Sequence, residues 1–414
     1  MKLLLVFLGV SLSIAMVVAE PAGARYQVRH GMFWDTKADC SFAPRGFNYV
    51  RLHHSHGTFD PTYYDPKVID ALFARLRQDG FNTVRVFING YVKLKGAIAI
   101  KDQQGLAQAY VVNVADFLRR ADAQHIGVVL STDSYPRVSP FIEMADYNKS
   151  AFHDENAEIL HRANVEARAL YLKTFIEALR RADASCLDAV LAYDLQNEWC
   201  YVMAPPFTLS NGTVTIGDGR VYTLPGQRQA LADDAAVYCI DTLAEAVRAA
   251  HPAAPIWVGV FTYNAVGKPG PDDFRIDSAA WKNRLPFRPL AILRSQANVL
   301  DLHFYCTNES DLLNDLKSIE FKRVQSEART RGVVMMVGEF GAFKGGSFTT
   351  ANAVSEWMAT QSSLFGRLGF AGWLYWTYDT HEQDATLWHA CSEDGSIYQK
   401  LKTQVQMQKP TIRN

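Results

Sequence analysis

Short apolar, β-branched runs alternate along most of the chain with longer segments of helical periodicity. In residues 66–80, Ile69, Leu72 and Leu76 recur at helical spacing, while Lys67 and Arg75 fall on the opposite, polar side. This spacing predicts an amphipathic helix that packs one face on a core. By the same pattern, helices are expected over residues 66–80, 111–124, 156–183, 227–250, 310–331 and 350–368.

The apolar runs between these segments predict eight strands. They are Arg45–Tyr49, Thr83–Ile88, Gly127–Ser131, Ala189–Leu195, Ile256–Phe261, Val299–Tyr305, Val333–Phe340 and Gly372–Tyr378. Strands that alternate with helices in this way are parallel and joined by crossover helices. A doubly wound open sheet uses the same unit. However, eight units without a glycine-rich phosphate loop after the first strand favour an α/β fold of the (β/α)8 TIM-barrel type.

One segment departs from this alternation. Residues 207–224 carry Asn-Gly and Asp-Gly turn signals between alternating residues, which predicts a small β-hairpin insertion after strand 4, set over the exit of that strand. Nothing resembling a linker or an internal repeat divides the rest. A single (β/α)8 domain is therefore expected over residues 23–414.

The N-terminal 22 residues have the layout of a secretory signal peptide. One lysine precedes an apolar run from Leu3 to Ala19, and small residues follow, so cleavage is expected near Ala19 or Ala22. A retained membrane anchor is the alternative, but the run is slightly short for a comfortable span. The mature chain is therefore expected to be secreted to the extracellular space, with no membrane association after signal cleavage.

Charge and cysteine content narrow the classes further. The 42 basic and 43 acidic residues give a net charge of −1, which offers nucleic acid no electrostatic attraction. The six cysteines are an even number, which favours disulfide bonds in an exported chain, although no pairing is assigned. No two are spaced as a zinc-binding Cys-x-x-Cys pair. Glycosylation sequons begin at Asn148, Asn211 and Asn308.

Polar residues stand where several predicted strands end, which is where active sites of such barrels lie. They are Arg85 on strand two, Asn197 and Glu198 after strand four, His303 and Tyr305 on strand six, Glu339 on strand seven and Trp376 on strand eight. Two buried carboxylates without neutralising partners are costly. Facing each other across a cleft, Glu198 and Glu339 suit glycosidic bond cleavage, one as proton donor and the other as nucleophile.

In this order and on these strands, the Asn-Glu, His-x-Tyr, Glu, Trp and Arg elements resemble family 5 of the glycoside hydrolases, over about residues 45–379. The resemblance implies a retaining enzyme of the cellulase and β-mannanase group, with Glu198 as acid/base and Glu339 as nucleophile. It further implies that Asn197 binds the sugar 2-hydroxyl, that Arg85 and Tyr305 contact the nucleophile, that His303 lies near the acid/base, and that Trp376 forms the floor beneath the sugar.

Some positions depart from the family pattern. Many members carry a histidine after strand three, where this chain reads Ser-Thr-Asp-Ser-Tyr-Pro, so Asp133 or Tyr135 takes over that role or the role is absent. Trp373 competes with Trp376 for the floor. Four further aromatic residues either line sugar subsites or pack in loops: Trp199, Tyr201, Phe261 and Tyr263.

Two rival functions use the same sequence differently. A metal-dependent TIM-barrel hydrolase is one, because His54 and His56 follow the first strand and His303 and Asp379 offer further ligands. The lack of a lysine on strand four and of a histidine after strand five weighs against it. A non-catalytic carbohydrate-binding barrel is the other, and it would leave Glu198 or Glu339 idle.

The sequence thus predicts a secreted retaining β-glycosidase that hydrolyses β-linked glucan or mannan poly- or oligosaccharides by double displacement. It is expected to act as a monomer on its carbohydrate substrate, with neither a metal nor an organic cofactor. The Glu-Phe-Gly sequence after strand seven leans towards β-mannanase-like members, and the general layout fits endo-β-1,4-glucanases equally well. The sugar, the linkage and endo or exo action stay open.

Overall fold

The computed structural model describes residues 23–53, 56–91, 96–101, 103–132, 135–145, 152, 154–261, 284–306, 308–345 and 348–407. The expected signal peptide lies outside these residues, as do His54, Asp133 and Tyr263.

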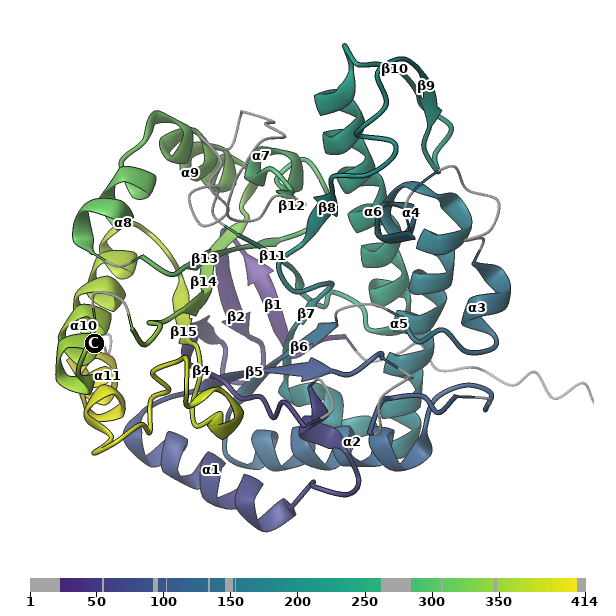
Figure 1. The fold of residues 1–414 in the computed structure, drawn as a ribbon. Coiled ribbons are helices and arrows are strands. Elements are labelled where there is room, and N and C mark those ends of the chain that lie inside the picture. The colour runs from purple at the N-terminus through teal and green to yellow at the C-terminus, as the bar shows by residue number, and fades with distance from the viewer. Residues whose placement is uncertain are drawn as a thin grey trace, which may run out of the picture.

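Eight parallel strands form a closed barrel at the centre of the molecule (Figure 1). Around the barrel they follow the order β11, β13, β14, β15, β4, β5, β6, β7. Their bounds are β4 Arg45–Asn48, β5 Thr83–Ile88, β6 Gly127–Thr132, β7 Val190–Asp194, β11 Ile256–Phe261, β13 Val299–Phe304, β14 Val334–Phe340 and β15 Gly372–Tyr375. All eight predicted strands are present, and the (β/α)8 barrel is confirmed.

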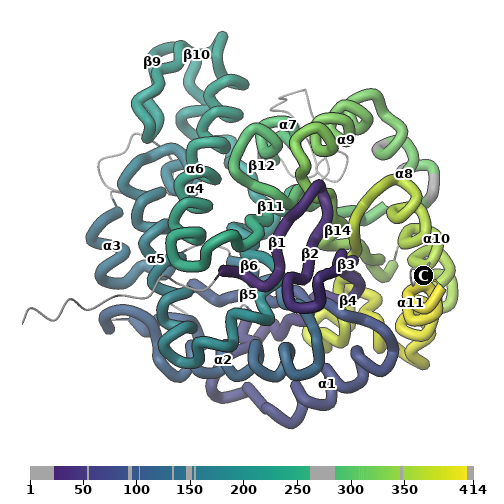
Figure 2. The backbone as a smooth tube through the Cα atoms, turned by 180° about the vertical axis from the view of Figure 1, so that it is seen from behind, coloured from purple at the N-terminus to yellow at the C-terminus, as the bar shows by residue number. Residues whose placement is uncertain are grey.

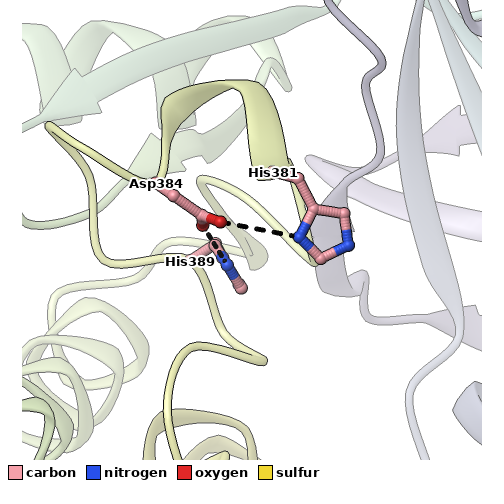
Figure 3. A group of neighbouring side chains, drawn as sticks. All are labelled: His381, Asp384 and His389. Atoms are coloured by element: carbon pink, nitrogen blue, oxygen red, sulfur yellow. Dashed lines mark ion pairs between the residues drawn. The ribbon is translucent and has the colours of Figure 1, made fainter.

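Helices surround the barrel, as Figure 1 shows. They are α1 Pro66–Asp79, α2 Gln108–Ala123, α3 Phe141–Met144, α4 Asp154–Leu160, α5 Arg162–Ala182, α6 Arg228–Ala250, α7 Pro289–Ile292, α8 Glu309–Leu316, α9 Ile319–Arg331, α10 Ala351–Arg367 and α11 Ser396–Met407. Short 3₁₀ helices also occur: η1 Gly57–Phe59, η2 Ala184–Ala189 and η4 His381–Gln383, the last of which is shown in Figure 3.

Two predicted helices are each divided in the structure. The segment 156–183 breaks at His161, because the Leu160 carbonyl accepts a hydrogen bond from Gly217 N, at 2.8 Å, in place of one that continues the helix. The segment 310–331 breaks before α9, where the Ser318 hydroxyl caps the new helix through Phe321 N at 3.1 Å. Side-chain caps and outside partners therefore set these ends, and helical periodicity alone does not reveal them.

An antiparallel sheet that the sequence did not predict closes one end of the barrel. It consists of β1 Tyr26–Arg29, β2 Met32–Asp35 and β3 Cys40–Phe42, and it lies across the barrel end seen in Figure 2. Tyr26 and Phe33 are buried in one cluster with Val129 and Trp257, which come from the beginnings of barrel strands or near them. This three-stranded sheet, called the plug below, therefore covers the N-terminal end of the barrel strands. The C-terminal end remains open for an active site.

The predicted hairpin is present but stands away from the barrel axis, above α6 and beside α4 (Figure 1). It comprises β9 Gly212–Thr215 and β10 Val221–Leu224, paired antiparallel with Thr215 opposite Val221. The Tyr222 hydroxyl donates to Asp234 on α6 at 2.9 Å. Its expected place over the exit of strand four is instead taken by β8 Cys200–Val202, which pairs with β12 Arg284–Pro286.

Two further expectations concern the whole chain. No disulfide bond joins any of the six cysteines, all of which lie in the part of the chain that the structure describes, so the bonds favoured by their even number are not formed. Cys186 and Cys239 are buried and fill space as small apolar side chains. Among the residues that the structure describes, there is no helix with enough length and apolar character to span a bilayer.

Candidate active site at the C-terminal end of the barrel

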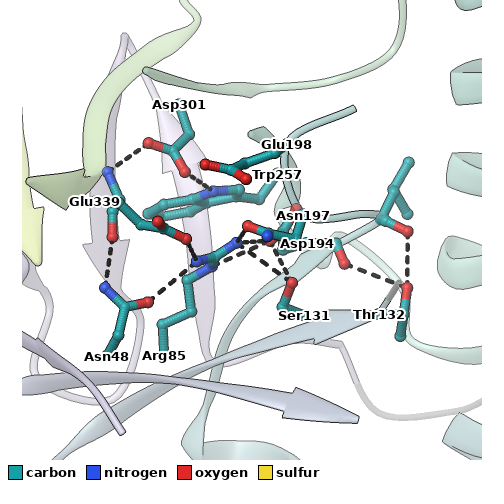
Figure 4. A network of polar contacts seen from close by, with 12 residues as sticks. Asn48, Arg85, Ser131, Thr132, Asp194, Asn197, Glu198, Trp257, Asp301 and Glu339 are labelled. Atoms are coloured by element: carbon teal, nitrogen blue, oxygen red, sulfur yellow. Dashed lines mark hydrogen bonds and ion pairs between the residues drawn. The ribbon is translucent and has the colours of Figure 1, made fainter. Parts of the chain in front are cut away.

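A buried arginine organises the polar residues at the open end of the barrel. Arg85, on β5, is fully buried, and Figure 4 shows its guanidinium among side chains from neighbouring strands. Its Nη1 donates to Glu339 Oε1 at 2.7 Å and to Asn48 Oδ1 at 3.0 Å, and its Nη2 donates to Asp194 Oδ2 and Asn197 Oδ1, each at 2.7 Å. Burial alone would lower the pKa of Arg85, but the charges of Asp194 and Glu339 raise it. The guanidinium is therefore a fixed positive charge.

Glu339 is held at both carboxylate oxygens. It lies on β14 with only 4% of its side chain exposed, and Oε1 accepts from Arg85. Its Oε2 accepts from the Tyr305 hydroxyl at 2.7 Å. Burial, together with the carboxylates of Glu339 and Glu198, raises the pKa of Tyr305 well above its usual value, so the phenol remains a donor. Two donors on two oxygens fix the orientation of the carboxylate.

Glu198 lies in the turn after β7 and is more open to solvent. Its side chain is 17% exposed, and its backbone φ of 48° falls in the left-handed region that non-glycine residues rarely adopt. Backbone hydrogen bonds from Leu195 N to Trp257 O at 3.0 Å and from Trp199 N to Gly259 O at 2.9 Å fix the chain on either side. The strained residue is therefore over-determined by its neighbours, as at many functional sites.

His303 connects the two ends of a buried polar chain. Its Nδ1 lies 3.1 Å from Glu198 Oε1 and 3.5 Å from Glu339 Oε2, and its Nε2 lies 3.0 Å from Asp301 Oδ2. Burial alone would lower the pKa of His303, but the carboxylates of Glu339 and Asp301 raise it well above its usual value. A charged imidazolium donates from both nitrogens, so His303 holds Glu198 and is held by Asp301.

Asp301 is a member of this site that sequence reasoning missed. It is fully buried, and besides His303 it accepts from Trp257 Nε1 at 2.8 Å and from the backbone amide of Gly338. A Cβ at Gly338 would lie 2.1 Å from its Oδ2, so the carboxylate occupies space that glycine leaves. Its only sequence signal is an aspartate two residues before His303 in an apolar strand.

Asp194 was missed for a similar reason. Its Oδ2 accepts from Arg85 and, at 2.6 Å, from the Ser131 hydroxyl. Both donors stabilise the charged form, but complete burial is the larger effect and raises the pKa of Asp194 to about 6. The signal in the sequence is again an acidic residue in an apolar strand, three positions before Asn197.

The two glutamates and the histidine converge on one point. Glu198, His303 and Glu339 each offer one ligand or reactive atom, and these atoms all lie within 4.8 Å of one another. Such a group can in principle hold a cation, but the guanidinium of Arg85 already lies against Glu339 and opposes a second positive charge there. A carboxyl pair at this separation fits a nucleophile and an acid/base on opposite sides of one glycosidic bond.

Comparison with known proteins decides the family. The sequence model described as cellulase (glycosyl hydrolase family 5) matches residues 43–382, most of the chain. The chain belongs to glycosyl hydrolase family 5. No curated protein matches the sequence of this family 5 hydrolase.

Solved structures similar to this family 5 hydrolase share its fold at low sequence identity. The endo-1,4-β-mannanase from Rhizomucor miehei is 12% identical at a TM-score of 0.60, with 92% of this chain and 100% of that chain covered. The exo-β-1,4-mannosidase from Opitutaceae bacterium strain TAV5 is 16% identical at a TM-score of 0.59, covering 91% and 61%. An endocellulase from Pyrococcus horikoshii is 16% identical at a TM-score of 0.57, covering 94% and 100%.

The family 5 hydrolase exposes only one of the two competing strand-eight tryptophans. Trp373 is 1% exposed and packs in the core, whereas Trp376 is half-buried and its Nε1 donates to Gln383 Oε1 at 3.1 Å. A Cβ at Gly341 would lie 2.8 Å from the Trp376 carbonyl oxygen and 3.3 Å from the Tyr305 ring. Glycine in the Glu-Phe-Gly sequence therefore lets the strand-seven and strand-eight loops approach each other.

Other aromatic residues predicted as possible subsites are packing residues in the family 5 hydrolase. Trp199 is fully buried and stacks on Phe287 with ring centroids 4.9 Å apart. Tyr201 is 1% exposed, and its hydroxyl donates to Ala232 O at 2.6 Å. Phe261 is 6% exposed. Burial at this level leaves no ring face of Trp199, Tyr201 or Phe261 for a sugar. Tyr135, which was offered in place of the strand-three histidine, is 1% exposed.

The rival metal cluster after strand one finds no support in the described residues, which do not include His54. His56 stacks on Phe87 with centroids 4.7 Å apart and belongs to no group of three possible metal ligands in that part of the chain. Asp379, which the same reading offered as a ligand, pairs with Arg51 at 2.8 Å. His303 is held between Asp301 and Glu198. His56, Asp379 and His303 therefore each make separate contacts.

Proposed function

We propose that this family 5 hydrolase is a retaining β-glycosidase in which Glu339 is the nucleophile and Glu198 the acid/base. The observation that carries the proposal is the approach of the reactive atoms of Glu198, His303 and Glu339 to within 4.8 Å of one another. Retaining glycosidases place their carboxyl groups about 5–5.5 Å apart, whereas inverting enzymes leave roughly 6.5–9.5 Å for a water molecule. Direct attack by a carboxylate suits the shorter separation.

The surroundings of the two glutamates support this division of roles. Glu339 is almost fully buried, and Arg85 and Tyr305 hold its two oxygens in one orientation, as a nucleophile requires. Glu198 is more exposed, with 17% of its side chain accessible, and its Oε1 lies 3.1 Å from His303 Nδ1, so solvent and a leaving group can reach it. The nucleophile needs a fixed charge, and the acid/base needs a proton that comes and goes.

The reaction proceeds in two displacements. In the first, a Glu339 oxygen attacks the anomeric carbon while Glu198 transfers its proton to the glycosidic oxygen, so the C–O bond breaks and a glycosyl ester forms. In the second, Glu198 takes a proton from water as the water oxygen attacks the anomeric carbon and expels Glu339. Both glutamates regain their initial protonation states, and the sugar leaves with its original anomeric configuration.

Carbohydrate contacts follow from the residues around this pair. Asn197 lies beside Glu198, with its Oδ1 held by Arg85, and so presents its amide NH₂ towards a sugar hydroxyl. The half-buried indole of Trp376 offers a flat face for the axial C–H bonds of a pyranose. The substrate class is a β-linked glucan or mannan, in line with the endo-mannanase, the exo-mannosidase and the endocellulase that share the fold.

Hydrolysis of a substrate panel tests the proposal. Purified protein is incubated with β-glucans, mannans and short oligosaccharides, and products are followed by reducing-sugar release and by NMR of the anomeric proton. We expect first-formed products of retained configuration on at least one substrate, and Glu339→Ala to lose turnover by about 10⁴-fold or more. Inverted products, or a fully active Glu339→Ala variant, would refute the assignment.

The proposal includes secretion of a monomer cleaved near Ala19 or Ala22. It rests on the N-terminal apolar run and the small residues that follow it. Mass spectrometry of the protein recovered from culture medium would give the mature N-terminus, and sedimentation would give its assembly state. A protein retained in the cell with an intact N-terminus would contradict this part of the proposal alone.

A further inference from the structure

A second group of possible ligands lies outside the catalytic site, in the segment after β15. His381 on η4, Asp384 just after it and His389 in the following loop turn their side chains towards one another (Figure 3). Asp384 lies between the two imidazoles. One of its oxygens is 2.6 Å from His389 Nε2, and the other is 3.7 Å from His381 Nδ1. One ligand atom from each residue lies within 4.8 Å of the others.

We propose that His381, Asp384 and His389 bind a divalent transition-metal cation of the zinc class. Two imidazole nitrogens and one carboxylate oxygen are donors that zinc prefers, whereas calcium and magnesium take oxygen ligands almost exclusively. Zinc holds such donors at about 2.0–2.2 Å in a tetrahedron, with a water molecule completing the set. The cation would replace the proton that His389 now shares with Asp384.

The exposure of the three ligands suits metal binding. His389 has only 6% of its side chain exposed, and the backbone on either side is pinned by hydrogen bonds from Trp388 N to Ala342 O and from Ala390 N to Thr377 O. It is therefore a fixed ligand. His381 is 73% exposed and Asp384 52%, so both side chains are free to rotate by the small amount needed to close on the cation. The cation reaches the site directly from solvent.

The hydrogen bonding of His389 supports a role beyond packing. Its Nδ1 is buried without a hydrogen-bond partner among the described residues, so the only polar partner that the ring faces is Asp384. Nε2 is therefore the ring nitrogen that faces the site, and a cation bound between it and the Asp384 carboxylate would take the place of the hydrogen bond that joins them.

The three proposed ligands flank Gln383, the residue that contacts Trp376, the proposed floor of the sugar site. Gln383 lies between His381 and Asp384 and accepts from Trp376 Nε1 at 3.1 Å. Its backbone carbonyl accepts from Leu387 N at 2.9 Å, inside the same loop. A cation that joins residues 381, 384 and 389 therefore fixes the turn on which the indole of Trp376 depends. This consequence for the sugar site rests on the proposed function, whereas the cation site does not.

Zinc binding to the full mature chain, freed of any histidine tag, tests the proposal without an activity assay. Equilibrium dialysis with zinc alone should give one ion per chain. His381→Ala should weaken binding at least about tenfold, and the same variant should lose the rise in Tm that zinc gives the parent. The matched control is His125→Asn, which changes an exposed histidine in the turn after α2 and should bind as the parent does.

A parallel measurement separates this site from the catalytic group, because Glu198, His303 and Glu339 also lie within ligand distance. Glu339→Gln should retain one zinc ion and the Tm rise. Cobalt in place of zinc should give the intense visible bands of a tetrahedral site, and His381→Ala should remove them. Equal zinc affinity in His381→Ala and the parent, or loss of zinc in Glu339→Gln alone, would overturn the proposal, whether or not the protein hydrolyses any glycoside.

Discussion

At the scale of single residues, the two glutamates have the same side chain and differ in their positions in the barrel wall. Glu339 lies on a strand and is gripped by Arg85 and Tyr305. Glu198 lies on a strained turn and meets His303 from β13. In the proposed mechanism the same side chain would serve two purposes, because one copy is surrounded by donors and the other is left partly open.

Replacing Glu198 by alanine should affect substrates according to their leaving groups. General acid assistance contributes about 10²–10⁴-fold, and only a poor leaving group needs it. We therefore expect kcat/KM on natural oligosaccharides to fall by about this factor, while dinitrophenyl glycosides, which depart without a proton, lose little. Parallel assays of the two substrate classes measure the difference.

Azide provides the control for this variant. A small anion attacks the glycosyl ester without a general base, so added azide should raise kcat of Glu198→Ala on the dinitrophenyl substrate and yield a glycosyl azide. The parent protein should not respond. An equal loss on both substrate classes, with no azide response, would contradict the acid/base role of Glu198.

Asp301→Asn should act on catalysis through His303. The substitution keeps the shape but removes a buried charge that raises the pKa of His303, so that pKa should fall. We expect kcat to drop on the order of 10- to 100-fold, as for carboxylates that orient a catalytic imidazole, and the pH–rate profile to shift towards lower pH. The profile is the deciding measurement, because a purely structural residue would change stability without moving it.

The matched control for Asp301→Asn is Asp35→Asn at the closed end of the barrel. Asp35 is also buried and pairs with Arg25 at 2.6 Å, but it lies on β2, far from the glutamates. The Asp35→Asn substitution should lower the free energy of unfolding and leave the pH–rate profile unchanged. Identical profiles for the parent and Asp301→Asn would mean that Asp301 does not position His303.

Whether a residue of this site can be predicted from the sequence depends on where its partners lie. Glu198 and Glu339 lie at or just after the ends of apolar runs, so the barrel pattern alone places them at one mouth, whereas Arg85 is followed by Val86, Phe87 and Ile88 in the same strand. Asp301 stands inside an apolar run, and the partners that make it useful, Trp257 and Gly338, come from β11 and β14. Only the register between strands brings these partners together, and a single sequence does not contain that register.

At the scale of elements, the hairpin β9–β10 does not take its expected place over the exit of strand four, where it would form a lid at the edge of the cleft. Instead, Val214, Ile216 and Tyr222 are buried against the helix layer, and Gly217 N completes the end of α4 through Leu160 O. The hairpin therefore stabilises α4 and α6, and its loss should cost folding before it alters specificity.

Ile216→Ala tests this structural role. Ile216 is 3% exposed, and removing a buried isoleucine side chain costs about 2–4 kcal/mol of unfolding free energy. We expect urea unfolding to show that loss while KM for oligosaccharides stays within about twofold of the parent. Val221→Ala, on the outer side of the same hairpin and 58% exposed, should change stability by about 0.5 kcal/mol or less. A changed product pattern in Ile216→Ala with unchanged stability would contradict the structural role and would favour a lid over the cleft.

Elements with strong periodicity were predictable, and short ones were not. The barrel strands and the long helices repeat one unit, so each supports the assignment of the next. The plug β1–β3 has strands of three or four residues, too short for a clear alternation, and its His30-Gly31 turn was the one available signal. Tertiary burial of Tyr26 and Phe33 in the barrel end, which local sequence does not show, makes these strands stable.

At the scale of the whole molecule, the closed end of the barrel is joined to the helix layer by a buried histidine. His251 follows α6 and is 3% exposed, and its Nδ1 is hydrogen-bonded to the Tyr193 hydroxyl of β7 at 3.0 Å. The next residue, Pro252, accepts from Ala24 N at 2.8 Å and so ties down the N-terminal segment. Burial lowers the pKa of His251 to about 4, with Arg180 acting in the same direction.

This histidine should make the molecule less stable in mild acid. In the unfolded chain a histidine binds a proton below about pH 6.5, whereas His251 in the folded protein stays neutral down to about pH 4. The unfolded state therefore holds one more proton across that window, and stability falls as pH drops through it, by about 3 kcal/mol in total. His303 contributes with the opposite sign, because its folded pKa is raised, and its stabilising effect is lost only as pH rises through that value.

Comparing His251→Gln with the parent isolates the contribution, because His303 and the carboxylates are common to both proteins and cancel. Glutamine offers an acceptor to Tyr193 but does not titrate, so urea unfolding between pH 7 and pH 4.5 should show a shallower loss of stability in the variant, whatever its absolute stability. His125→Gln, at an exposed turn, should keep the parent's slope. If the unfolding free energies of His251→Gln and the parent fall equally steeply with pH, the buried ring takes up its proton while the protein is folded. That result would contradict a lowered pKa of His251.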